Sequence, residues 1–390
     1  GVGVAVVSGL DDVDARDLKR ATRAQHVELE PMVMMDNPMG APEVVAYDGE
    51  ITSPDDPTTA GWFPAQWNMR AIGAPEAWAA GRLGDPGTTV AILDTGIDYD
   101  YPDLVGRVDL SRSVSFLPVD DFYVDLFFPG RHPITDLHYH GTHVASTVAS
   151  NGNVIAGVTS GVTLVGIKVC SVLGGCPGSA IFAGVAHAIA IEADVANMSL
   201  GGSFTKRDFP GFVSAVQRLF NAANRAGVTM VVAAGNDAVD MDHDGNGFRT
   251  YCNAANVVCV SATGPTGGGT FTAGPFPNPD AFAGYSNFGR SAISVAAPGG
   301  NVPAVVAACS TTSLIIPVCG TGTFVLGLGG TSMASPHAAG VAALISEDVG
   351  RRPGLIRQRL HKSADDVGQT GPDPYYGKGR VNAGAAVGAN

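Results

Sequence analysis

Three side chains that could act together to cleave an acyl bond lie far apart along the chain: Asp94, His140 and Ser332. A serine hydroxyl becomes a nucleophile when a histidine takes its proton, and a carboxylate can hold that histidine in the required tautomer. Each residue also has a plainer interpretation, because Asp often forms turns, His often packs in a core and Ser often caps a helix. The hydrolytic chemistry therefore depends on the fold bringing all three together.

Ser332 lies within Gly-Gly-Thr-Ser-Met-Ala-Ser-Pro-His at residues 329–337, where the glycines permit close approach and Pro336 supports a helix that starts near Ser332. A hydroxyl at a helix start faces backbone N–H groups and the positive end of the helix dipole, which favour an oxyanion beside it. Asn236 ends the apolar run at residues 230–235, so its amide could supply a second donor. A turn-forming asparagine is the alternative.

His138, His140 and His143 have His-x-His-x-x-His spacing, which can gather on one divalent metal ion. A metal-dependent hydrolase is therefore the rival prediction, and it would make Ser332 dispensable. An α/β-hydrolase esterase is disfavoured because no Gly-x-Ser-x-Gly occurs. A non-catalytic binding protein on the same scaffold is a further alternative.

Apolar strands alternate with helices from about Trp67 onward, which is the pattern of a parallel sheet covered by helices on both faces. Strands are predicted at residues 89–93, 162–169, 195–198, 228–233 and 293–296. Asp94 and Asn236 follow two of them and so fall at the carboxyl edge of the sheet, where sites in open α/β sheets gather. His140 is predicted in the first turn of a helix.

An apolar stripe from Phe212 to Phe220 predicts a second kind of element, a surface helix that ends at Gly227. Residues 181–189 carry a similar stripe. Gly141, Ala145 and Ala149 form a ridge of small residues on which a helix could press closely against the sheet.

The composition excludes several classes of partner. A formal charge of −13, from 23 basic and 36 acidic residues, argues against nucleic acids and anionic membranes. Apolar residues make up 45% of the chain without a run long enough to span a bilayer. The chain opens with Gly1 and shows no signal-peptide pattern, so we expect a targeting segment to be missing from it. Export of the protein is a separate inference.

Six cysteines fall into three local pairs, Cys170/Cys176, Cys252/Cys259 and Cys309/Cys319, each able to close a short loop. An even count fits disulfides in an oxidising compartment better than a zinc site. Unpaired buried thiols in a cytosolic protein are the alternative.

Together the motifs resemble those of the subtilisin-like serine proteases, in that family's order of Asp, His and Ser, from about residue 67 to residue 386. The resemblance is carried by Asp-Thr-Gly-Ile-Asp from Asp94, His-Gly-Thr-His-Val-Ala from His140, Gly-Thr-Ser-Met-Ala-Ser-Pro around Ser332 and Ala-Ala-Gly-Asn ending at Asn236. It implies a three-layer α/β fold with a mostly parallel central sheet, and a secreted, monomeric serine endopeptidase that needs no cofactor for catalysis. The four residues would be the orienting carboxylate, the general base, the nucleophile and the oxyanion donor, respectively.

The resemblance also implies where a protein or peptide substrate binds. Ser199, Leu200 and Gly201, in Asn-Met-Ser-Leu-Gly-Gly, would form one edge of the cleft, and Gly174 and Gly175 the other. Substrate would lie between these edges as an added β-strand.

A structural calcium ion is a further implication, because Asp103 in Tyr-Pro-Asp-Leu matches a calcium-binding carboxylate of many members, although its partner loop at residues 151–156 is short. Asp242, Asp244 and Asn246 also have the spacing of a calcium loop, but the loop lacks the closing Glu and is more typical of a solvated acidic loop.

Three domains or segments are expected. Residues 1–35 resemble the second half of the family's inhibitory propeptide, with residues 26–31 as its closing strand, and the chain's own propeptide would then be a partner. Residues 36–65 are rich in Pro, Asp, Gly and Thr and predict an exposed linker or N-terminal extension. Residues 66–390 form the catalytic domain, and self-cleavage is expected within residues 32–65.

Overall fold

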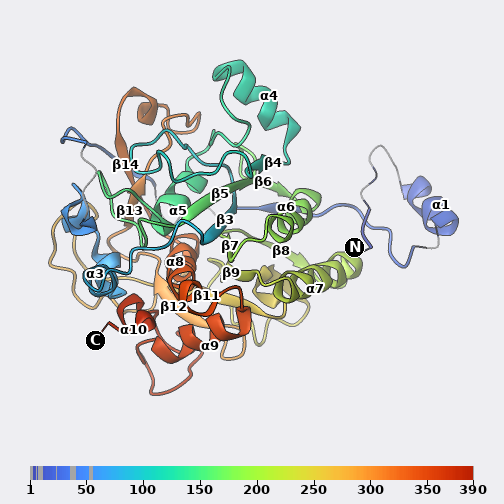
Figure 1. The fold of residues 1–390 in the computed structure, drawn as a ribbon. Coiled ribbons are helices and arrows are strands. Elements are labelled where there is room, and N and C mark those ends of the chain that lie inside the picture. The colour runs from blue at the N-terminus through green and yellow to red at the C-terminus, as the bar shows by residue number, and fades with distance from the viewer. Residues whose placement is uncertain are drawn as a thin grey trace.

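A seven-stranded sheet forms the centre of the protein in the computed structural model, which describes residues 3–5, 7, 12–22, 24–35, 41–51 and 56–389 (Figure 1). The strand order is β12-β11-β9-β7-β3-β5-β4, and neighbouring strands pair in parallel throughout. The strands are β3 (Thr89–Asp94), β4 (Val114–Ser115), β5 (Thr163–Lys168), β7 (Val195–Met198), β9 (Thr229–Ala233), β11 (Val257–Thr263) and β12 (Val295–Pro298). The parallel sheet predicted from the sequence is confirmed.

Helices cover both faces of this sheet, because alternate strand residues face two separate cores. Val90 and Ile92 of β3 pack in the core that contains α5 (His140–Val148) and α8 (Thr331–Val349). Ala91 and Leu93 pack instead in the core that contains α6 (Gly178–Ala190) and α7 (Pro210–Arg225). Because most of these strands are buried on both faces, their sequences are mainly apolar, as is typical of parallel strands. The predicted three-layer α/β fold is therefore confirmed.

The helix ends follow from local sequence. Helix α7 ends just before Gly227, which has φ +91° and so adopts the left-handed conformation that terminates many helices. Helix α8 is buried on all sides from Thr331 to Ser346, which fits its run of alanines and small residues. No helix among the described residues combines the length and the apolar character needed to cross a bilayer.

Smaller elements complete the domain. Three further sheets among the described residues are antiparallel. One is formed by β13 (Val305–Ala308), β14 (Phe324–Leu328) and β2 (Glu43–Ala46), one by β8 (Gly201–Thr205) and β10 (Gly247–Thr250), and one by β1 (Met32–Met34) and β6 (Gly175–Pro177). The remaining α-helices are α1 (Asp12–Thr22), α2 (Trp67–Ala71), α3 (Ala74–Ala79), α4 (Pro118–Phe127), α9 (Pro353–Ser363) and α10 (Ala383–Val387). In Figure 1, α1 stands away from the body of the domain.

The linker or N-terminal extension predicted at residues 36–65 is more often exposed than buried where the structure describes it, but parts of it pack on the domain. Strand β2 pairs with β14, and Ala60 and Ala65 are buried. Val45 packs beside the core of β13 and β14, so apolar residues within the Pro-rich stretch anchor it. Residues 36–40 and 52–55 lie outside the described residues. Strand β2, Ala60 and Ala65 are the parts of this stretch that contact the domain most closely.

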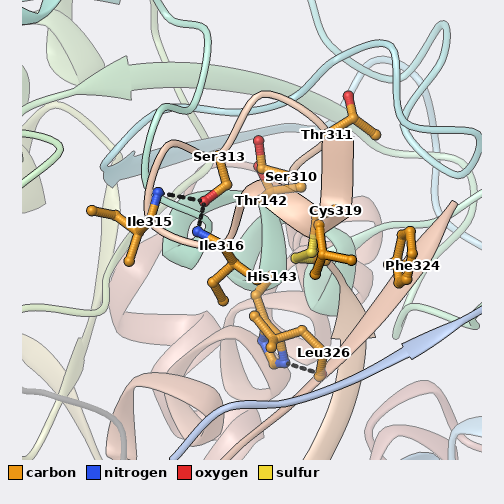
Figure 2. The surroundings of a disulfide bond; sticks show 12 residues. Thr142, His143, Ser310, Thr311, Ser313, Ile315, Ile316, Cys319, Phe324 and Leu326 are labelled. Carbon is orange, nitrogen blue, oxygen red and sulfur yellow. Dashed lines mark hydrogen bonds between the residues drawn. A yellow bond between two sulfur atoms is a disulfide. The ribbon is translucent and has the colours of Figure 1, made fainter. Parts of the chain in front are cut away.

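All three local cysteine pairs form disulfides, as predicted. The Cys309–Cys319 disulfide closes a loop that is also held by its own side chains (Figure 2). Within it the Ser313 hydroxyl accepts hydrogen bonds from the backbone N–H groups of Ile315 and Ile316, at 3.2 and 2.9 Å. The loop is therefore a compact unit, and it lies beside the start of α5.

Candidate active site

Asp94 and His140 form a buried, hydrogen-bonded pair. Asp94 is the last residue of β3 and His140 the first of α5, and His140 Nδ1 lies 2.8 Å from Asp94 Oδ1. A carboxylate can only accept, so Nδ1 carries the proton and Nε2 is the nitrogen that can act as a base. Gly141 makes the approach possible, because a Cβ there would lie 2.1 Å from the carbonyl oxygen of Gly96. The two side chains are thus brought together by the end of a strand and the start of a helix.

Ser332 is the second residue of α8 and forms two hydrogen bonds with Ser199, one as donor and one as acceptor. Its Oγ donates to the Ser199 carbonyl at 3.2 Å, and its own carbonyl accepts from the Ser199 hydroxyl at 2.8 Å. Pro336 has no N–H with which to close the helical bond to the Ser332 carbonyl, which leaves that oxygen available to Ser199. Only 3% of Ser332 is exposed.

The two pairs lie at the ends of neighbouring strands. Ile92 of β3 is in register with Asn197 of β7, so two residues further along each strand come Asp94 and Ser199. Ser199 holds Ser332, and Asp94 holds His140. The fold therefore gathers the three predicted residues at one carboxyl edge of the sheet.

Asn236 follows β9 at the same edge and is held by Thr331, the residue before Ser332. Its Oδ1 accepts from the Thr331 backbone N–H at 2.9 Å and from the Thr331 hydroxyl at 3.0 Å. Its Nδ2 is inaccessible to solvent and has no hydrogen-bond partner among the described residues. Gly330, at φ +151°, lets the backbone approach, since a Cβ there would lie 3.3 Å from Nδ2. A buried amide N–H₂ without an acceptor is costly unless a ligand oxygen occupies the position at some stage.

The three histidines of the rival prediction do not converge on a metal site. His143 Nε2 lies 3.2 and 3.1 Å from the carbonyl oxygens of Val305 and Leu326, the latter contact being visible in Figure 2. Burial lowers the pKa of His143 and that of His138 to about 3, so both rings are neutral. Within the part of the chain that the structure describes, no three His, Cys, Asp or Glu side chains are grouped to hold a metal ion. The geometry therefore gives the metal-dependent hydrolase no support.

The surroundings of Asp103 give the predicted calcium site no support. Its buried carboxylate accepts hydrogen bonds from the backbone N–H groups of Asn153, Val154 and Ile155, at 2.6 to 3.2 Å. Calcium requires oxygen ligands, whereas the backbone of this loop presents N–H donors, which stabilise the carboxylate by hydrogen bonds. Burial also raises the pKa of Asp103 to about 6. Backbone N–H groups of the short loop thus surround the Asp103 carboxylate.

The second acidic loop is likewise occupied by protein groups. Asp242 accepts from the backbone N–H and hydroxyl of Ser291, and Asp244 lies 3.5 Å from the ammonium of Lys206. These two carboxylates point to different partners, which agrees with an acidic surface loop.

The cleft predicted for substrate is filled by the chain's own N-terminal segment. Strand β1 (Met32–Met34) pairs antiparallel with β6 (Gly175–Pro177), and Met35 N donates to the Gly174 carbonyl at 2.8 Å. On the other side Val33 is 1% exposed and lies against Gly202, where a Cβ would be 3.0 Å from Val33 Cγ1. A strand therefore lies between the Gly174–Gly175 edge and the segment that follows Ser199 and Leu200.

Residues 26–31, predicted as the closing strand of a propeptide, form no strand in the structure, and the pairing with β6 begins only at Met32. Pro31 has no N–H to donate, so its contribution is limited to its carbonyl, which accepts from Gly178 N at 3.1 Å. The paired strand follows the proline.

Sequence reasoning missed Asp136, whose buried carboxylate accepts hydrogen bonds from Thr95 and Thr142. Its signal was an acidic residue in a segment that leads directly into His140. The alternation of apolar residues could not reveal it, because Asp136 lies in a loop.

Comparison with other proteins identifies a family and several relatives. The model of the subtilase family matches residues 85–379, more than half of the chain. Thermitase from Thermoactinomyces vulgaris is 31% identical over 340 residues, which cover 86% of this chain and 99% of thermitase. M-protease from Shouchella clausii (strain KSM-K16) is 32% identical over 350 residues, which cover 88% of this chain and 73% of that protein.

Solved structures agree on the fold. The crystal structure of a lanthipeptide protease has a TM-score of 0.65 at 25% identity, covering 84% of this chain and 93% of the other. That of the epidermin leader peptide processing serine protease from Staphylococcus aureus has a TM-score of 0.69 at 22% identity, covering 87% and 82%. The region matched by the family model contains β3, α5 and the start of α8, which carry Asp94, His140 and Ser332.

Proposed function

Because the chain belongs to the subtilase family and is a serine endopeptidase, we propose that Ser332 is its nucleophile, His140 its general base and acid, and Asp94 the carboxylate that orients His140. Asn236 is the proposed side-chain donor to the oxyanion. The backbone N–H of Ser332 is the second donor, since the first N–H groups of a helix lack an intrahelical acceptor.

The observation that carries this proposal is the Asp94–His140 hydrogen bond at the end of β3, next to the strand end whose Ser199 holds Ser332. Further support comes from the unpartnered Nδ2 of Asn236, because Oδ1 of the same amide is bonded to Thr331, the residue before Ser332.

In the proposed reaction His140 Nε2 takes the Ser332 proton while Oγ attacks the scissile carbonyl carbon. The carbonyl oxygen becomes an oxyanion and receives hydrogen bonds from Asn236 Nδ2 and the Ser332 N–H. The imidazolium, held by Asp94, then protonates the leaving amine and an acyl-enzyme remains. Water, deprotonated by His140, attacks the acyl carbon and releases the acid product. Side chains and water suffice, so no catalytic cofactor is proposed, and no calcium site is proposed at Asp103.

The proposed substrate is an extended polypeptide that adds as a strand between Gly174–Gly175 and Ser199–Gly201. Support comes from β1, which occupies this position with backbone pairing to β6. Such binding fixes the substrate mainly through its backbone, and a buried apolar side chain at the position of Val33 adds specificity.

Residues 24–35 are proposed to act as an inhibitory segment of the chain itself. Besides β1, the segment is held by two carboxylates at helix starts. Glu28 accepts from the N–H groups of Gly211 and Phe212 at 2.7 and 2.9 Å, at the start of α7, and Glu30 accepts from Ser179 N in α6. Each carboxylate satisfies free N–H groups and interacts favourably with the helix dipole. The segment thereby competes with substrate for the cleft.

Self-cleavage is predicted directly after this strand, within residues 36–40. Strand β1 runs from the start of α6 toward Gly174, which lies in the loop after β5. The first residues of that loop, Val169 and Cys170, donate hydrogen bonds from their backbone N–H groups to the Asp94 carbonyl, at 2.9 and 3.1 Å. The carboxyl end of β1 therefore faces the side of the sheet where the proposed triad lies. Time-resolved mass spectrometry and N-terminal sequencing of the purified protein should find the new N-terminus in this window.

Val33→Asp is expected to slow that cleavage by about tenfold or more, because a buried charge without a partner prevents the strand from docking. Met32→Asp is the matched control, since Met32 lies on the same strand but is 59% exposed. Equal cleavage rates in the two variants, or a mature N-terminus far from Met35, would show that β1 does not present the bond.

A serine-directed phosphonate is predicted to label Ser332 and to abolish casein hydrolysis in proportion to labelling, while a chelator leaves hydrolysis largely intact. The physical reason is that only a serine activated by a nearby base attacks the phosphorus. Peptide mapping of the labelled protein locates the adduct. Labelling at another residue, or loss of all hydrolysis with chelator, would overturn the proposal.

We also propose that the enzyme is a secreted monomer. The three disulfides support an oxidising location.

A further inference from the structure

Asp136 is a fully buried carboxylate that lies shortly before His140 and receives hydrogen bonds on both oxygens. Thr95 Oγ1 and the His138 backbone N–H donate to Oδ1, at 2.9 and 3.0 Å. The backbone N–H and the hydroxyl of Thr142 donate to Oδ2, at 3.0 and 2.6 Å. Each of these groups donates, which is what a buried negative charge requires.

Two of these donor residues, Thr95 and Thr142, lie next to or within the elements that carry the proposed carboxylate and base. Thr95 is in the turn directly after β3, and Thr142 is in the first turn of α5. Thr95 Oγ1 also accepts from the Gly141 backbone N–H at 2.9 Å, which makes a second link between that turn and the helix. Asp136 therefore joins the end of β3 to the start of α5 by a short polar bridge.

The backbone of Asp136 is held by the loop between Cys309 and Cys319. The hydroxyls of Ser310 and Thr312 both donate to the Asp136 carbonyl, at 2.7 and 2.8 Å. Two further bonds follow along the chain: Leu314 N to the Leu137 carbonyl at 2.8 Å, and the Ser313 hydroxyl to the His138 carbonyl. Three consecutive carbonyls before the base are thus held by one cross-linked loop.

We propose that Asp136 is a positioning residue for the reaction: its carboxylate sets the distance and orientation of His140 relative to Asp94. The inference rests on the proposed roles of those two residues. Asp136 does not reach the reacting atoms. It acts through its hydrogen bonds with Thr95 and Thr142, while the Cys309–Cys319 loop holds the backbone of Asp136 in place.

Asp136→Asn tests this inference, because an amide has the same shape as a carboxylate but has only one acceptor oxygen. Its N–H₂ group must then face either the two donors to Oδ1 or the two donors to Oδ2. At least two of the bonds are lost, and the start of α5 must shift. A displacement on the order of 1 Å costs about 100-fold in rate, so kcat for a peptide substrate should fall by about 100-fold while KM stays within about threefold. Each variant is first matured with a trace of affinity-tagged wild-type enzyme, which is then removed.

Asp103→Asn is the matched control, since it too replaces a buried carboxylate that is held by backbone N–H groups, but away from the reacting residues. It should lower thermal stability and leave the kcat of the folded protein unchanged. Thr95→Val is a milder second variant that removes one arm of the bridge, and its kcat should fall by about tenfold with KM unchanged.

The outcomes separate the inference from the proposed function. If Ser332→Ala is inactive while Asp136→Asn and Thr95→Val have the same kcat as Asp103→Asn, the positioning role is overturned and the proposed nucleophile stands. If Ser332→Ala is as active as wild type, the proposed function itself fails. A selective fall in kcat for both bridge variants supports the inference.

Discussion

Ser332→Ala lowers kcat for a peptide substrate by about 10⁶-fold, which is the scale known for loss of the nucleophile in subtilisins. The reason is that no covalent acyl-enzyme can form, and only the oxyanion donors and substrate binding continue to favour hydrolysis. The substitution removes one oxygen, so the cost in stability is small beside the loss of rate. Steady-state kinetics on a chromogenic peptide, with the folded fraction measured by circular dichroism, provides the test.

Ser346→Ala is the matched control for this prediction, because Ser346 lies in the same helix and is equally buried. It should retain the activity of the wild type. The Ser332→Ala chain should also keep its N-terminal segment indefinitely when incubated alone, since self-cleavage needs the same nucleophile. Turnover by Ser332→Ala above about one thousandth of the wild-type rate would identify another group as the nucleophile.

Asn236→Ala is expected to lower kcat by about 100- to 1,000-fold with little change in KM, a loss known for the side-chain oxyanion donor of subtilisin. The amide contributes only when the carbonyl oxygen becomes charged, so substrate binding is nearly unaffected. Asn236 Oδ1 also holds Thr331, and a small additional effect on stability is therefore expected.

Asn382→Ala serves as its control, because Asn382 caps α10 through a bond from Ala385 N to its Oδ1 and is remote from β9. This variant loses a helix cap, which typically costs about 1 kcal/mol, and should keep its kcat. A rise in KM with unchanged kcat for Asn236→Ala would mean that the amide binds substrate rather than the transition state.

Much of the scaffold could be predicted from sequence because buried parallel strands are apolar on both faces. Strands β3, β5, β7 and β9 were each recognised within two residues of their ends, and Gly227 marked the end of α7. Strand β11 has a similar composition but was missed. No α-helix precedes it after β9, so the alternation of strand and helix that guided the other assignments is interrupted there.

The sequence was least informative where the outcome depends on what a group meets in three dimensions. Asp103 carries a family motif, yet its loop supplies N–H donors instead of calcium ligands, and only the backbone geometry distinguishes the two. The stretch that includes β2 was predicted to be an exposed linker or an N-terminal extension from its Pro, Asp, Gly and Thr content, which gives no sign of a strand. Pairing with β14 depends on a strand nearly 280 residues later, which local pattern cannot reveal.

The burial of α8 ties the nucleophile to the stability of the whole domain. Helices at a surface fray, and their amide hydrogens exchange through local opening, whereas a helix enclosed on all sides can open only when the layers around it separate. Ser332 lies in the first turn of such a helix. Heat or denaturant would therefore remove the nucleophile in the same cooperative event that melts the domain, and the enzyme would remain fully competent until that point.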